Sequence, residues 1–110
     1  MKFVFALPFM VTFIVQPAIA ANELQQWQSR ALKAIKQEKK VIDAKWRSAE
    51  DNVIWLSMQS DGSPRDGFAQ YVCILLKHSG APEGTLKSVW IYDPVSYETG
   101  GSAMGIAACR

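Results

Sequence analysis

The sequence predicts a small α+β domain, a two-layer sandwich in which two helices cover one face of a three-stranded sheet. Three observations support this fold. Apolar residues recur at helical spacing in two segments, and they alternate or run together in three shorter segments. These segments follow one another in the order helix, strand, strand, helix, strand (αββαβ). A last apolar stretch, residues 106–109, leaves room for a short fourth strand at the C-terminus.

The first 20 residues have the three parts of a secretory signal peptide. Lys2 supplies a positive start, an apolar run covers residues 3–15, and small residues stand at positions 18 and 20 before the expected cleavage site. The run is shorter than the roughly 20 residues that span a bilayer. We therefore expect residues 1–20 to be removed and residues 21–110 to fold as one small α+β domain. The protein is then periplasmic or secreted, with no stable membrane insertion after cleavage.

The first helix is predicted at the start of the mature chain. Asn22 is a residue type that caps helix N-termini, and Gln25 three residues later completes a capping-box pattern. An apolar stripe at helical spacing follows, and it consists of Leu24, Trp27, Ala31 and Ile35. We expect the basic residues on the other side of this helix to form a solvated face.

Two strands are predicted after this helix. Apolar and charged side chains alternate in residues 41–47, as in a half-buried strand. We expect the apolar set to face the core, and it consists of Ile42, Ala44 and Trp46. Residues 53–58 are almost wholly apolar, which favours a central strand. Alternate side chains of a strand point to opposite faces. One face of this second strand therefore carries Ile54, Leu56 and Met58, and the other carries Val53, Trp55 and Ser57.

The second helix is predicted to begin at Ser63. Ser63 can cap the helix, Pro64 suits its first position, and Asp66 places a negative charge in its first turn. The apolar stripe that follows is made of Phe68, Tyr71, Val72 and Leu75. Gly80 is expected to end the helix, because glycine is the usual terminator.

The third strand is predicted at residues 85–92. Trp90 shares a face with Leu86, so we expect both in the core, and residues 95–105 show no clear period. The first two strands should pair antiparallel across their short turn, and the third should return through the helix to run parallel to the second. The apolar second strand favours the order 1-2-3. The alternative places the first strand at the centre of an antiparallel sheet.

Cys73 and Cys109 are the two cysteines of the chain. An even number of cysteines in a small exported domain favours a disulfide. Closing the loop between them would stabilise the fold by about 3–4 kcal/mol on the chain-entropy model. The alternative is an enzyme that uses a catalytic thiol at Cys73 or the imidazole of His78.

The sequence shows no assembled set of catalytic or metal-binding residues. His78 is the only imidazole, and its place near the end of the second helix suits a cation that interacts with the helix dipole. Residues 61–66 lack the alternating acids of a calcium loop, and two cysteines with one histidine do not make a zinc site. We therefore expect no cofactor and no metal. With 12 Lys and Arg against 10 Asp and Glu, the chain also lacks the basic excess of nucleic-acid-binding proteins.

These observations lead to the hypothesis of a small exported, non-catalytic binding domain stabilised by one disulfide. Val53, Trp55 and Ser57 are its candidate interaction surface, because two helices on one face of the sheet would leave them on the other. The partner would be a protein or an envelope component. Alternatively, residues 95–109 fold over this face. The alternative functions are a small secreted hydrolase or thiol-dependent enzyme using Cys73 or His78, and a structural subunit of an envelope assembly.

Overall fold

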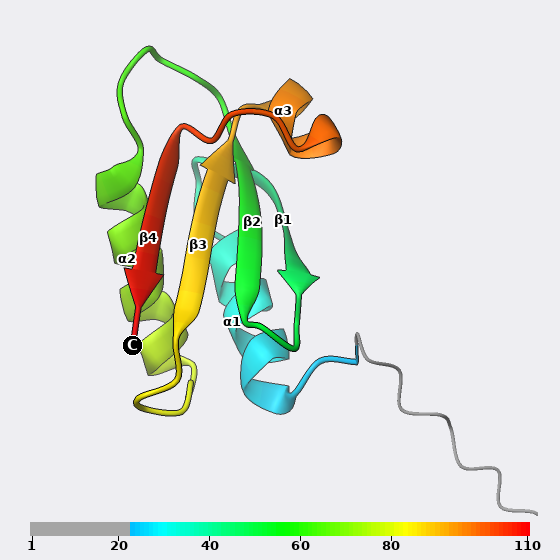
Figure 1. The fold of residues 1–110 in the computed structure, drawn as a ribbon, viewed down its shortest axis with the longest axis vertical. Coiled ribbons are helices and arrows are strands. Elements are labelled where there is room, and N and C mark those ends of the chain that lie inside the picture. Colours follow the sequence, from blue (N-terminus) through cyan, green and yellow to red (C-terminus); the bar gives the residue numbers. More distant parts are fainter. Residues whose placement is uncertain (1–22) are drawn as a thin grey trace, which may run out of the picture.

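The computed structural model describes residues 23–110. The predicted signal peptide, its cleavage site and Asn22 lie outside the described residues. The described part of the chain forms three helices and four strands (Figure 1). In chain order they are α1 (Gln26–Lys36), β1 (Val41–Ser48), β2 (Val53–Met58), α2 (Asp66–His78), β3 (Lys87–Tyr92), α3 (Pro94–Thr99) and β4 (Gly105–Cys109).

The four strands form one mixed sheet in the order β1-β2-β3-β4. β1 and β2 are antiparallel because a short turn joins them, and β2 and β3 are parallel because the chain returns through α2. β4 pairs antiparallel with the other edge of β3. The α+β class, the strand order 1-2-3 and the short fourth strand at the C-terminus are therefore confirmed.

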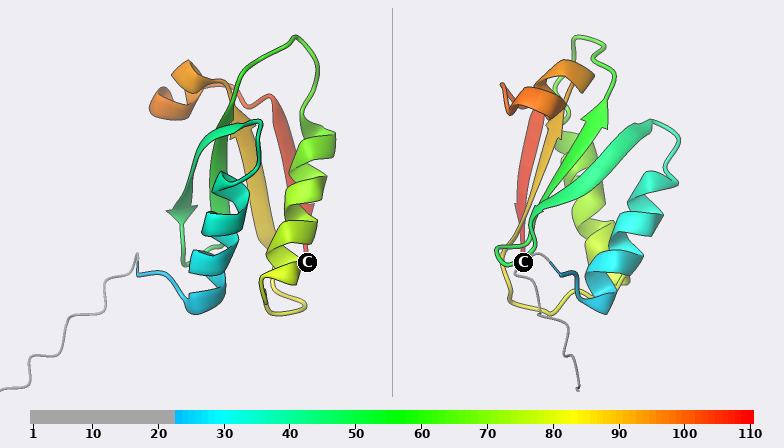
Figure 2. Two further views of the ribbon diagram at one scale, coloured as in Figure 1. Left: turned by 180° about the vertical axis from the view of Figure 1, so that it is seen from behind. Right: turned by 90° about the vertical axis from the view of Figure 1, so that its right-hand side faces the viewer.

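Helices α1 and α2 lie side by side on one face of the sheet and form the second layer (Figure 2). The core fills the space between this helical layer and the sheet. Burial of each large apolar side chain there stabilises the fold by about 1.5–3 kcal/mol. The fully buried members are Ala31, Ile35, Ile54, Leu56, Met58, Ala69, Val72, Leu76, Val89 and Ile91.

A disulfide joins Cys73 of α2 to Cys109 of β4, as the sequence predicts. The two Cα atoms are 5.7 Å apart, within the usual range for this bond. At the other end of β4, Asp66 Oδ1 accepts a hydrogen bond from the Ile106 N–H at 3.0 Å. Gly105 lies against the backbone of Arg65, where a side chain would not fit. The last strand is therefore attached to α2 at both of its ends.

The first helix begins later than the sequence predicts. α1 begins at Gln26, and Gln28 Oε1 accepts a hydrogen bond from the Gln25 N–H at 2.8 Å. The capping-box pattern therefore belongs to Gln25 and Gln28, and the prediction that Asn22 begins the helix is wrong. A glutamine three residues downstream occurs for both Asn22 and Gln25, so the pattern alone does not distinguish the two starts.

The second helix also begins later. Ser63 does not cap it: its N–H and its hydroxyl both donate to Asp61 Oδ1 in the preceding turn. α2 begins at Asp66 with Arg65 as the N-cap residue. Serine and aspartate bond to nearby backbone in turns as readily as at helix ends, and here the turn is formed.

The prediction that Ile42 faces the core is wrong. Ile42 is 51% exposed, whereas Val41 and Ala44 are buried. The pairing of β1 with β2 is irregular between Val41 and Asp43, so an extra residue interrupts the alternation of faces. A strict period of two does not reveal such a bulge.

The prediction that Trp90 lies in the core is also wrong. Val89 and Ile91 are fully buried under the helices, and Trp90 points to the opposite side of β3. Leu86, which was expected beside Trp90, precedes the strand and is 49% exposed. Alternation separates the two faces of β3 correctly, but both faces carry large apolar residues, so composition does not identify the buried one.

Helix α3 falls in a segment for which the sequence predicts no regular structure. Asp93 caps it by accepting a hydrogen bond from the Ser96 N–H at 2.8 Å, and Pro94 occupies its first turn. Gly100 ends it at a φ of 76°, a conformation that glycine adopts without strain. These signals are present in the sequence, but so short a helix shows no apolar period.

Candidate functional site

The face of the sheet opposite α1 and α2 carries one row of side chains across all four strands. Lys45 of β1 lies beside Trp55 of β2, Trp55 beside Trp90 of β3, and Trp90 beside Ile106 of β4. Figure 1 views this side of the sheet, with α1 and α2 behind it. We call it the open face, and it comprises this row together with Arg47, Val53, Ser88, Tyr92 and Ala108.

Trp55 lies near the centre of the open face and is half-buried. Its ring centre is 4.6 Å from that of Tyr92, in a tilted arrangement. Two cations approach its ring: Lys45 Nζ at 5.7 Å and the Arg47 guanidinium carbon at 5.2 Å from the centre. Both cationic side chains are exposed, so their attraction to the indole is weak, of the order of 0.5–1 kcal/mol each.

Trp90 is the second indole of the open face and is also half-buried. Its Nε1 donates to Ser88 Oγ at 2.7 Å, which satisfies the indole N–H. Tyr92 lies beside it, with ring centres 6.4 Å apart and the ring planes 18° from parallel. Tyr92 is only 2% exposed, and this burial raises the pKa of its hydroxyl, an effect that Arg47 partly offsets.

Two adjoining hollows lie on the open face. The larger, of about 480 Å³, is lined by Lys45, Trp46, Arg47, Trp55, Glu98, Thr99 and Gly100. The other, of about 310 Å³, is lined by Arg47, Ser48, Val53, Trp55, Ser88, Trp90 and Tyr92. Arg47 and Trp55 belong to both. The first hollow is rich in charge, and the second is walled mainly by hydrocarbon and aromatic groups.

Helix α3 covers one end of the open face (Figure 1 and Figure 2). Its Tyr97 is 3% exposed, and Lys45 Nζ lies 4.5 Å from the centre of the Tyr97 ring. The buried Tyr97 hydroxyl makes no hydrogen bond within the described residues. Burial raises the pKa of Tyr97, and the negative charges of Asp43 and Glu98 raise it further.

Of the three residues that the sequence indicated as the interaction surface, two are accessible on the open face and one is buried. Val53 and Trp55 lie on the open face and line its hollows, while Ser57 is 2% exposed. The C-terminal segment does cover part of this face through α3, but β4 extends the sheet sideways. Trp90, Tyr92, Lys45 and Arg47 complete the surface. Alternation along the first and third strands could have grouped them, once the buried face was known.

The sites weighed for catalysis and metal binding have other roles in the fold. The sulfur of Cys73 is bonded to Cys109, and His78 is the exposed last residue of α2. Residues 23–110 contain no cluster of three or more His, Cys, Asp or Glu side chains arranged to hold a metal ion.

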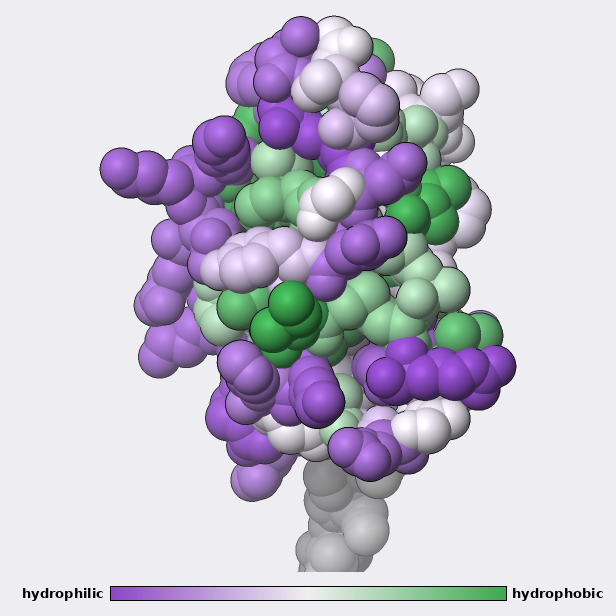
Figure 3. Space-filling view, turned by 90° about the vertical axis from the view of Figure 1, so that its left-hand side faces the viewer, coloured by the Kyte–Doolittle hydropathy of each residue, from purple (hydrophilic) through white to green (hydrophobic). Residues whose placement is uncertain are grey.

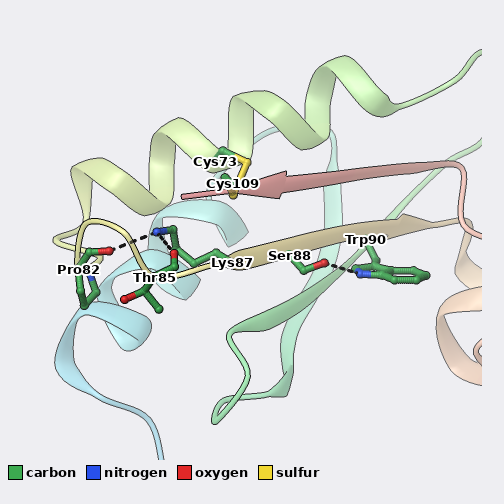
Figure 4. The surroundings of a disulfide bond; sticks show 7 residues. All are labelled: Cys73, Pro82, Thr85, Lys87, Ser88, Trp90 and Cys109. Carbon is green, nitrogen blue, oxygen red and sulfur yellow. Dashed lines mark hydrogen bonds between the residues drawn. A yellow bond between two sulfur atoms is a disulfide. The ribbon is translucent and has the colours of Figure 1, made fainter.

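Near the disulfide, Lys87 of β3 is buried, with 3% of its surface exposed. Its ammonium donates to the backbone oxygens of Thr85 at 2.6 Å and Pro82 at 3.3 Å (Figure 4). Carbonyl oxygens thus replace the water that a buried ammonium loses. Lys87 therefore fixes the loop before β3.

Elsewhere the apolar surface is scattered. On the side formed by α2 and β4, green apolar areas are separated by purple polar side chains (Figure 3). Ile74 and Tyr71 are the large apolar residues exposed on α2, at 50% and 39%, whereas Ile106 of β4, at 45%, belongs to the open face. Single exposed apolar residues of this kind are normal on protein surfaces.

None of the helices within residues 23–110 combines the length and hydropathy needed to cross a membrane.

The open face is therefore the place where large aromatic groups, exposed cations and hollows meet. Its chemistry is that of recognition: indole faces for apolar contact and guanidinium and ammonium groups for anions. Comparisons of the chain with known protein families, with curated proteins and with solved structures found no match.

Proposed function

We propose that the protein is a small exported, non-catalytic binding domain that meets its partner, a protein or an envelope component, with the open face of its sheet. The observation that carries the proposal is the row Lys45–Trp55–Trp90–Ile106, which crosses all four strands on the side opposite α1 and α2. Trp, Tyr and Arg are the residue types that contribute most to binding energy at protein interfaces. All three types are gathered here around two hollows.

The folding energetics support this proposal. The core on the helical side already buries the large apolar residues of β2 and β3. The indoles of Trp55 and Trp90 lie outside that core, on the other face of the sheet. Both are half-buried and remain partly in contact with water. Retaining large apolar groups at a surface suits a site that a partner covers.

Two independent features support an exported location: the signal-peptide pattern of residues 1–20 and the disulfide. The pattern of residues 1–20 is that of a signal peptide. The Cys73–Cys109 bond is of the kind that forms and persists in oxidising compartments. The same bond removes the thiol that a Cys73-dependent enzyme would require, which supports a binding role over catalysis.

Site-specific photo-crosslinking in the producing cell tests the proposal. A photoreactive residue is introduced at Ala108 or at Thr99, both exposed at the margins of the open face. Matched controls carry it at Lys33 of α1 or Gln70 of α2, both exposed on the helical side. We expect one defined adduct from the two open-face positions, lost in the Trp90→Ala variant, and none from the control positions.

Three results would contradict the proposal. Adducts from Lys33 or Gln70 with none from Ala108 or Thr99 would place the binding surface on the helices. Crosslinks only between copies of the chain would favour the structural subunit of an envelope assembly. A hydrolytic activity abolished by His78→Ala would instead favour the enzyme.

A further inference from the structure

We propose that the open face binds a short acidic–apolar segment of a partner protein, with a carboxylate at Lys45 and Arg47 and an apolar side chain in the hollow beside Trp90. This inference rests on the proposed function and adds the chemistry of the ligand. It is argued from three features: the free cations, the walls of the smaller hollow and the distance between them.

The cations of the open face have no acidic partner. The salt bridges found within residues 23–110 are Lys36–Asp43 and Arg65–Asp61, and neither includes Lys45 or Arg47. Both side chains are exposed on β1, and both belong to the larger hollow, where Glu98 is the one acidic neighbour. A carboxylate can bind a guanidinium through two parallel hydrogen bonds, which the indole of Trp55 does not offer. The charge of this surface therefore favours an anionic group.

The smaller hollow favours an apolar group next to that anion. Its walls are mainly Val53, Trp55, Trp90 and Tyr92, and Arg47, Ser48 and Ser88 complete the lining. The Trp90 N–H is already taken by Ser88, so the indole presents mainly hydrocarbon. Because few polar groups line the hollow, a saccharide would leave most of its hydroxyl groups without partners, at a cost for each buried polar group. A leucine or phenylalanine side chain would leave none.

The spacing between the two subsites suits a peptide. Arg47 lies on β1 and Trp90 on β3, with β2 between them. Neighbouring strands are about 4.8 Å apart, so the subsites are separated by roughly 10 Å. An extended chain advances about 3.3 Å per residue. Only even spacings place two side chains on the same side of an extended chain, so the acidic and apolar residues of the partner should stand two or four positions apart, which brackets this distance.

Strand addition at the sheet edges is disfavoured by the structure. On the edge strand β4, the Ile106 N–H is bonded to Asp66 Oδ1 at 3.0 Å. On the edge strand β1, the Ala44 N–H is bonded to Asp43 Oδ1 at 2.9 Å. A partner strand needs free backbone donors at an edge. A strand added at either edge would therefore have to displace one of these carboxylates, whereas the open face presents exposed side chains without such a change.

A selection from a phage-displayed library of random dodecapeptides tests the inference, with the exported, disulfide-bonded protein as bait. We expect enriched peptides with Asp or Glu two or four residues from Leu, Phe or Trp. Arg47→Glu should weaken binding of a selected peptide by about tenfold or more, as should Trp90→Ala. The control Lys33→Glu makes the same charge change on exposed α1 and should leave binding unchanged. Trp90→Phe keeps an aromatic wall and should retain part of the affinity, and melting curves confirm that each variant is folded.

Each other outcome overturns part of the argument. Peptides without acidic residues that still require Trp90 would refute the acidic ligand and leave the proposed function standing. Peptides insensitive to both Arg47→Glu and Trp90→Ala would refute the inference and the proposed surface together. An absence of enriched peptides would refute the peptide ligand. So would binding to phosphatidylglycerol vesicles or to polygalacturonate in place of peptides, which would assign the face to a lipid or an anionic saccharide.

Discussion

Trp55 and Leu56 are neighbours in the chain whose side chains lie on opposite faces of β2. Leu56 is fully buried between the sheet and the helices, whereas Trp55 is half-buried on the open face beside Tyr92. The core packs around Leu56 from both layers, whereas two exposed cations, Lys45 and Arg47, approach the ring of Trp55. This pair allows folding and recognition to be separated by experiment.

Leu56→Ala is expected to lower the free energy of unfolding by about 2–5 kcal/mol, because it removes buried methyl groups and leaves a cavity. Trp55→Ala should cost less than the roughly 3–5 kcal/mol typical of a fully buried Trp, since its side chain is only partly buried. Denaturant melts of the two variants measure the difference. Equal losses would show that the open face is as essential to folding as the core, and the recognition surface would then lie elsewhere.

The disulfide provides a second prediction. Cys73→Ser should lower stability by roughly 2–4 kcal/mol, because the unfolded chain regains the freedom of the loop up to Cys109. Mass spectrometry of the unreduced exported protein should find no thiol open to alkylation, and the variant should expose one at Cys109. Two reactive thiols in the exported wild-type protein would contradict the prediction and favour a thiol-dependent enzyme.

A third prediction concerns Gln28, which is buried with 1% of its surface exposed. Its Nε2 donates to the Ala49 oxygen and to Asn52 Oδ1, both at 2.9 Å, and so joins α1 to the turn between β1 and β2. Gln28→Ala leaves these groups without partners and should cost about 1–3 kcal/mol. The control Gln26→Ala removes an exposed glutamine one half-turn away and should change stability by less than about 0.5 kcal/mol. Equal effects in melting experiments would show that the buried contacts contribute nothing specific.

A fourth prediction follows from the raised pKa of Tyr97. A group whose pKa is higher in the folded state stabilises the fold fully below its unfolded pKa, near 10, and loses that contribution as the pH rises above it. Stability should therefore fall above about pH 10, and Tyr97→Phe should reduce the fall. At neutral pH the same variant should be neutral or slightly stabilising, because the buried hydroxyl makes no hydrogen bond within the described residues. Stability curves at several pH values test both parts, and an unchanged decline above pH 10 in the variant would count against them.

The fifth prediction concerns the N-terminus. Export should remove residues 1–20, so N-terminal sequencing of the native protein should begin at Ala21, or within a residue or two of it. Lys2→Glu removes the positive start and should slow this processing. An intact Met1 on protein recovered from the membrane fraction would contradict the exported location.

Much of the architecture could be predicted because it depends on local pattern. The continuous apolar run of β2 indicated the central strand, and its alternation placed Ile54, Leu56 and Met58 in the core correctly. The parallel pairing of β2 with β3 followed from the helix between them. The disulfide followed from compartment and number, since two cysteines allow one intramolecular pairing.

The candidate site could be predicted only in part. Trp55 was found from the sequence because its neighbours Ile54 and Leu56 marked the opposite face as core. Trp90 was missed, because both faces of β3 carry large apolar side chains and only packing against α1 and α2 decides which is buried. Arg47 and Lys45 carried no signal of their own, since exposed cations on an edge strand have many neutral roles.

The sequence by itself determined the order of the main elements, the pairing of the cysteines and the faces of the central strand, since periodicity and residue type are local properties. The tertiary structure alone decided which side of β3 met the helices, where the bulge turned Ile42 outward and how α3 closed one end of the open face. These features depend on contacts between segments far apart in the chain. The meeting of Arg47, Trp55 and Trp90 is of the same kind, because it arises only when three strands pair in register.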